Sequence, residues 1–144
     1  MSPRSDSDRW MSQAQHDLAA AEHAASGDFH ALACFLCQQS AEKAVAGYLF
    51  ARGADHIWGH ALADLCEDAM QLDKSFDVIK SVAMLLDKYY LPTRYPTGLP
   101  GGVPQDVYDG IDSGRALEIA GDVLEFVNSR LRSLSEAAQQ TSDQ

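Results

Sequence analysis

The sequence predicts an all-α protein, an antiparallel up-and-down four-helix bundle with an additional short helix. Three observations support this fold class. Apolar residues recur every three or four positions in several long segments. Capping residues and glycines stand where these segments would start and stop. No segment alternates apolar and polar residues in the manner of a half-buried strand.

Two helices are predicted in the first third of the chain. The first follows the cap candidates at positions 5–8 and runs to about Ser26. Its stripe consists of Trp10, Ala14, Leu18, Ala21 and Ala25. The second spans about 28–52 and ends at Gly53. Because it is apolar over more than half of its circumference, it must be central or covered on two sides.

Three further helices are predicted downstream. One covers about 59–72, the next starts at Asp73 or Ser75 and ends before Pro92, and the last runs from Asp112 or Ser113 to about Leu134. The last helix has two apolar stripes: Leu117, Ala120, Leu124, Val127, Leu131 and Leu134 in one, and Ile119, Val123 and Phe126 in the other. One stripe can face the core. The second, together with the very apolar second helix, predicts a homodimer.

The chain is long enough for one domain with a single core. We predict a flexible N-terminus at 1–8, one helical domain at 9–134 and a disordered polar tail at 135–144. No apolar run approaches the roughly 20 residues of a membrane span, and the first residues do not resemble a secretory signal. These features and the three cysteines predict a cytoplasmic, reducing location.

The charge balance narrows the class of partner. Eleven Lys and Arg residues stand against twenty-one Asp and Glu residues, for a net charge of −10. A chain this acidic is a poor general nucleic-acid binder, since such binding depends on phosphate neutralisation. A few converging cations could still hold a small anion.

Metal-ligating residues lack the spacing of a metal site. Cys34 and Cys37 have the CxxC spacing but lie in an apolar helical segment, which favours buried thiols. His16, His23 and His30 are seven apart, but the break at Gly27 spoils their alignment. We therefore predict no metal site and expect these histidines to face solvent.

The segment 91–104, LPTRYPTGLPGGVP, is an unusual connection between two helices. It holds four of the five prolines and three of the ten glycines of the chain. Loops of this length are usually functional or disordered, and its prolines and apolar residues predict an ordered one. Arg94 lies inside it, either to hold an anionic ligand or to fasten the loop through Asp87 or Glu118.

Glu42 and Lys43 lie in the apolar second helix. They form either a solvated strip or a pair directed into a dimer cleft. His56 and His60, at the entry to the third helix, are either proton carriers or capping and packing residues.

Several motifs together resemble the HEPN (higher eukaryotes and prokaryotes nucleotide-binding) domain family. Arg9-Trp10 with Gln13-Ala14 and Asp17-Leu18, followed by CFLCQQSAEKA at 34–44, resembles its first two helices. HALADL at 60–65 is similar to the entry of its third helix. The Tyr89-Tyr90 pair and TRYP at 93–96 resemble the subgroup that includes the C-terminal domain of sacsin. The resemblance covers about 9–134.

The resemblance implies a helical bundle that forms a homodimer. Some members are thought to bind nucleotides in a charged cavity near the dimer interface. Others are ribonucleases, often toxins partnered with a minimal nucleotidyltransferase, and carry an Arg followed after four to six residues by a His. Here no histidine follows Arg94, since His60 is the last in the chain. RNA cleavage needs proton transfer that Arg94 alone would not supply, so we predict that the chain is not an enzyme.

The leading hypothesis from the sequence is a non-catalytic homodimer that binds a nucleotide such as ATP or GTP near the dimer interface. Arg94 would contact phosphate, with Lys43 and Lys88 as further cations, and Tyr95 or Tyr90 could stack on the base. Candidate partner proteins are a nucleotidyltransferase or a chaperone-type protein. One alternative is a dimerisation or scaffold module without a small ligand. Another is a toxin-type ribonuclease with a nucleotidyltransferase partner.

Overall fold

The computed structural model describes residues 3–57, 61–90 and 95–142. Its helices are α1 (Pro3–Ser26), α2 (His30–Ala51), α3 (Leu62–Leu72), α4 (Asp77–Asp87), α5 (Pro104–Val107) and α6 (Gly110–Ser142). Two single 3₁₀ turns, η1 (Lys74–Phe76) and η2 (Pro96–Gly98), complete the elements. The described residues contain no strand, so the predicted all-α class is confirmed.

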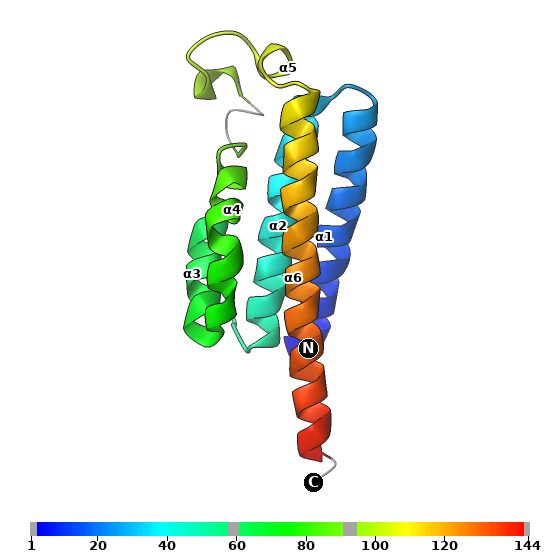
Figure 1. Ribbon diagram of the computed structural model, residues 1–144, viewed down its shortest axis with the longest axis vertical. Helices are drawn as coiled ribbons and strands as arrows, with labels where there is room; N and C mark the ends of the chain where they lie inside the picture. Colours follow the sequence, from blue (N-terminus) through cyan, green and yellow to red (C-terminus); the bar gives the residue numbers. More distant parts are fainter. Residues whose placement is uncertain (1–2, 58–60, 91–94, 143–144) are drawn as a thin grey trace.

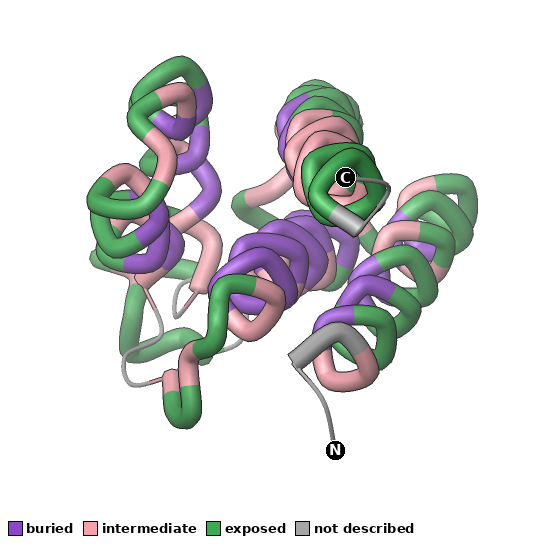
Figure 2. Tube along the Cα trace, turned by 90° about the horizontal axis from the view of Figure 1, so that it is seen from below, coloured by how far each residue is buried: buried purple, intermediate pink, exposed green. Residues whose placement is uncertain are grey.

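Three long helices and one short hairpin build the bundle (Figure 1). Helices α1, α2 and α6 lie alongside one another, and α3 and α4 pack as an antiparallel pair beside α2. Figure 2 shows α2 between α1 and the α3–α4 pair, with α6 across one of its faces. The opposite face of α2 has no helix over it.

The central position of α2 explains its composition. Its fully buried residues, which pack against neighbours on several sides, are Ala33, Cys34, Cys37, Gln38, Ser40, Ala41, Ala44, Val45 and Tyr48. Close approach to α1 occurs at Gly47, where an added Cβ would lie 3.3 Å from the sulfur of Met11. Ser40 Oγ donates a hydrogen bond of 2.7 Å to the carbonyl of Ala14 and ties the same two helices.

Both apolar stripes of α6 are largely buried within the single chain. Ala120 and Val127 of the first stripe are fully buried, and so is Val123 of the second. Phe126 is half-buried and packs edge to face on Phe76, with ring centroids 5.1 Å apart. The second stripe therefore needs no partner chain, because α6 contacts α2, α1 and α4 at once.

The helix ends differ from the predicted ones. Helix α1 already begins at Pro3, and α6 continues to Ser142, eight residues beyond the expected end at Leu134. Both extensions are polar, but Glu, Ala and Gln at 136–140 are good helix formers. Gly53 ends α2 as predicted, and its φ of 98° lies in the left-handed region that favours glycine.

All three cysteines are buried, as predicted for the CxxC pair. Burial raises the pKa of the thiols of Cys34, Cys37 and Cys66 to about 12. A thiol with such a pKa carries almost no thiolate at neutral pH, and thiolate is the reactive and metal-binding form. The cysteines therefore behave as small core residues.

None of the described helices has the length and apolar character needed to cross a membrane.

Candidate functional site

The part of α2 that no helix covers is the candidate site. We call it the α2 face; it consists of Leu32, Phe35, Leu36, Gln39, Glu42, Lys43 and Phe50. Leu32 is 49% exposed, and the other six residues are half-buried. Helical spacing places all seven on one side of α2. The face is apolar towards both ends and polar in its middle.

The polar middle of the α2 face is paired within the chain. Lys43 Nζ donates a hydrogen bond to the Asp17 carboxylate on α1 and forms an ion pair with it. Gln39 Nε2 donates to Glu42 Oε2 over 3.1 Å and to Gln38 Oε1 over 2.7 Å. Glu42 and Lys43 are both half-buried, and each is engaged with a neighbouring side chain of the same chain.

Asp87 joins this polar middle to the start of α3. Its carboxylate accepts hydrogen bonds from the backbone N–H groups of Leu62 and Ala63, over 2.7 and 2.9 Å. It also accepts a longer bond of 3.4 Å from the fully buried Gln38 amide. A carboxylate at a helix start satisfies backbone donors and complements the helix dipole. Asp87, at the end of α4, therefore caps α3.

The aromatic pair before the loop borders the α2 face. The Tyr90 ring packs on Phe35, with centroids 6.3 Å apart and planes at 43°. Tyr89 contacts Tyr108 edge to face at 5.8 Å. Both tyrosines are half-buried, so they attach the start of the connection to the bundle.

The predicted site residues do not all come together. Tyr90 lies beside the α2 face, whereas Lys88 is exposed at the end of α4 and Tyr95 is 47% exposed before η2. Lys43 is already neutralised by Asp17. Arg94 and His60 lie outside the described residues, so their roles stay predictions.

The charges around the α2 face disfavour an anion at its centre. Asp17, Glu42 and Asp87 bring three carboxylates there, and Lys43 alone faces them from α2. Lys88 differs, because it has no carboxylate partner among the described residues. The middle of the α2 face is therefore an unfavourable place for a phosphate.

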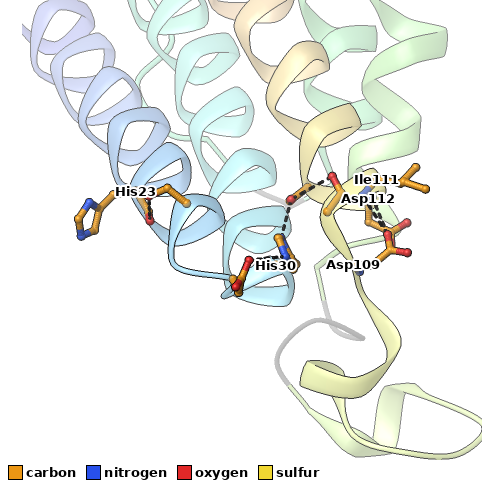
Figure 3. A network of polar contacts seen from close by, with 9 residues as sticks. His23, His30, Asp109, Ile111 and Asp112 are labelled. Atoms are coloured by element: carbon orange, nitrogen blue, oxygen red, sulfur yellow. Dashed lines mark hydrogen bonds and ion pairs between the residues drawn. The ribbon is translucent and has the colours of Figure 1, made fainter.

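A second polar cluster lies where α2 and α6 begin (Figure 3). His30 Nδ1 forms a hydrogen bond of 2.8 Å with Ser113 Oγ, and His30 Nε2 lies 3.4 Å from an oxygen of Asp28. The expectation that His30 faces solvent is therefore wrong; it is half-buried and links two helices. His16 and His23 are exposed as expected. Helical spacing gave no sign of the His30 contact, because its partner is 83 residues away.

A pocket of about 500 Å³ adjoins this cluster. Its lining comes from the start of α2 and the start of α5: Asp28, Phe29, His30, Ala31, Leu32, Val103, Pro104 and Gln105. Phe29 is 66% exposed there and continues the apolar surface of Leu32. The apolar end of the α2 face thus extends over the end of the bundle.

A second groove, of about 390 Å³, lies beside the middle of the α2 face and is lined by Arg9, Trp10, Gln13 and Lys43. Trp10 is 37% exposed and stacks on Phe50, with centroids 5.4 Å apart. These two rings form the apolar surface at the other end of the face.

Solved structures share this arrangement. The protein TT1696 of Thermus thermophilus is 36% identical, with a TM-score of 0.80 over 85% of this chain and 96% of that one. The archaeal HEPN homologue ST0689 is also 36% identical, with a TM-score of 0.72 over 86% and 96%. A HEPN domain protein of Thermotoga maritima, TM0613, is 29% identical, with a TM-score of 0.68 over 86% and 98%.

The family comparison agrees with the structural one. A search among proteins of curated function found no significant match. The family model of the HEPN domain matches residues 7–130, which include most of α1, all of α2 to α5 and most of α6. The predicted resemblance is confirmed at the level of the family, and the chain belongs to the HEPN domain family.

Proposed function

We propose that the chain is a non-catalytic homodimerisation module that pairs through the α2 face. The observation that carries this proposal is the uncovered side of the central helix, which is apolar at both ends. The two α6 stripes are largely buried within one chain, so they give no reason to expect a dimer contact there. The proposed contact is therefore formed by the α2 face and the exposed rings beside it. Its non-catalytic character follows from the absence of any histidine after Arg94.

The spacing along the α2 face suits a two-fold pairing. Leu32 and Phe50 stand nine residues to either side of Ala41, and Gln39 and Lys43 stand two to either side. In an antiparallel α2–α2 contact centred there, Leu32 would meet Phe50 of the second copy. Gln39 would meet Lys43 of that copy. Such self-complementarity is what a two-fold interface requires.

Changing Leu32 to Asp is expected to convert the dimer to a monomer, because a two-fold interface buries the added charge twice. Met84→Asp is the matched control, since Met84 is 51% exposed, against 49% for Leu32, and lies on α4. Light scattering coupled to size exclusion measures the masses. Equal dimer content in the wild type and Leu32→Asp would contradict the assignment of this face.

We propose in addition that the loop beside this interface binds an anionic ligand of the nucleotide class, with Arg94 and Lys88 on the phosphates and Tyr95 on the base. The exposed Lys88 and the half-exposed Tyr95 ring support this second function. The TRYP motif also supports a place in the sacsin-like branch. Lys43 is not part of this site, because Asp17 occupies its charge.

Calorimetric titration with ATP and with GTP is expected to show binding by the wild type and at least about a tenfold loss in Arg94→Ala and Lys88→Ala. Lys74→Ala, an exposed lysine on η1, is the control and should bind as the wild type does. A large fall in melting temperature of Arg94→Ala with unchanged binding would identify a fastening role instead. No heat change at millimolar nucleotide would contradict the ligand proposal.

A further inference from the structure

A groove lies between α4 and α6, and Figure 2 shows α6 on the side of α2 opposite the α2 face. Its volume is about 470 Å³, and its lining is Val78, Ile79, Val82, Asp122, Glu125, Phe126 and Ser129. Val78 is 68% exposed and Val82 is 38% exposed, one helical turn apart on α4. No residue of this groove takes part in the proposed function.

The floor of the groove is held in place by the core. Phe126 packs on the fully buried Phe76, which in turn packs on Tyr48 with ring centroids 4.5 Å apart. At the lower end, Arg130 Nε donates a hydrogen bond of 2.7 Å to Asp73 and joins α6 to η1. The apolar lining is therefore preformed, which lowers the entropic cost of binding.

One wall of the groove is acidic. Glu118, Asp122 and Glu125 follow one another at helical spacing along α6 and are all exposed. Arg115 lies about two turns from Asp122 towards the start of α6. The carboxylates of Asp122 and Glu125 have no hydrogen bond or ion pair among the described residues. They are free to pair with an incoming cation.

From these observations we propose that the α4–α6 groove binds an amphipathic helix of another protein, with an apolar row flanked by Lys or Arg. The row would lie on Val78, Val82 and Phe126, and the cations would pair with Asp122 and Glu125. Helix α4, with eleven residues, gives such a segment about three turns of contact.

Charge favours this occupant over a second copy of the chain. A two-fold contact through the groove would set Asp122 and Glu125 against the same acidic stripe of the other copy, and like charges oppose association. This chain is also poor in cations, with eleven Lys and Arg residues against twenty-one Asp and Glu residues. A basic partner helix gains from the same stripe.

The test uses three labelled probe peptides of about 14 residues, or roughly four helical turns. The first has Leu along one helical face and Lys elsewhere, the second has Glu in place of Lys, and the third has the composition of the first in an order that breaks the Leu row. Fluorescence anisotropy measures their affinity for the full chain. The wild type is expected to bind only the first, with a micromolar Kd.

Two sets of variants assign the contact to the groove. Val78→Asp with Val82→Asp should weaken binding of the Lys peptide at least about tenfold, whereas Met84→Asp, on another face of α4, should change it less than about twofold. The double variant Asp122→Lys, Glu125→Lys should have a lower affinity for the Lys peptide than the wild type and should bind the Glu peptide. All these side chains are exposed, and unchanged melting temperatures would show that the fold is intact.

Several outcomes would overturn the proposal. They are equal binding of the broken-row peptide, an equal loss in Met84→Asp, or no binding at about 1 mM peptide. Conversion of a dimer to a monomer by Val78→Asp with Val82→Asp would show that a second copy occupies the groove. Because none of these variants touches the α2 face, a failure of peptide binding alone leaves the proposed dimer untouched, whereas a monomer in the Val78→Asp, Val82→Asp variant would also contradict pairing through the α2 face.

Discussion

Changing Phe76 to Ala is expected to lower the free energy of unfolding by about 3–5 kcal/mol, the largest single loss that we predict. Phe76 is fully buried and joins the Tyr48 ring of α2 to the Phe126 ring of α6. Its removal leaves a cavity where three elements meet, and the aromatic contacts are lost in addition to the buried area. The melting temperature should fall by about 10 °C or more.

Urea unfolding followed by circular dichroism measures this loss. Val78→Ala is the matched control, since Val78 lies two residues away but is 68% exposed, and it should change the stability by less than about 0.5 kcal/mol. A loss below about 1 kcal/mol in Phe76→Ala would contradict the central role of this ring. The control also shows whether α4 itself is sensitive to substitution.

Changing Asp87 to Ala is expected to cost about 2 kcal/mol, which combines the loss of a helix cap with weaker pairing of a buried amide. The carboxylate serves the N–H groups of Leu62 and Ala63 at once. Gln38, which is fully buried, keeps its contact with Glu42 but loses the bond to Asp87. Denaturant unfolding measures the total.

Amide hydrogen exchange separates the cap from a general loss of stability. In Asp87→Ala the amides of Leu62 and Ala63 should exchange much faster, while those in the middle of α2 follow only the global change. Asp87→Asn retains one oxygen acceptor and should lose less than Asp87→Ala. Uniform acceleration along the whole chain would show that Asp87 does not act as a local cap.

Helical periodicity predicted what depends on a single element. It identified α1, α2, α3, α4 and α6, the stop at Gly53 and the burial of Cys34 and Cys37. It predicted that α2 is central or covered on two sides, and the structure has it at the centre. These features are encoded locally, in spacing and capping residues.

What the sequence could not predict depends on which elements are neighbours. The second stripe of α6 suggested a partner chain, but α2, α1 and α4 together cover both stripes. The sequence makes Lys43 a candidate ligand-binding cation, because no local spacing indicates that Asp17, 26 residues earlier, is its ion-pair partner. Gln38 and Asp87 were also missed as a pair, since 49 residues separate them.

The α2 face and the loop beside it organise the proposed function. In the proposal the apolar ends of the face provide self-association, and its polar middle is already paired within the chain. We propose the anionic ligand at the loop because three carboxylates, those of Asp17, Glu42 and Asp87, lie around the middle of α2. The proposed basic helix would bind on the far side, where Asp122 and Glu125 of α6 have no partner among the described residues.

The mass of the wild-type protein in solution tests the central claim most directly. Light scattering coupled to size exclusion at micromolar concentration should give twice the 15.7 kDa of one chain. Leu32→Asp should give the single-chain mass, and Met84→Asp should match the wild type. A single-chain mass for the wild type, at every concentration up to its solubility, would contradict a homodimer built on the α2 face.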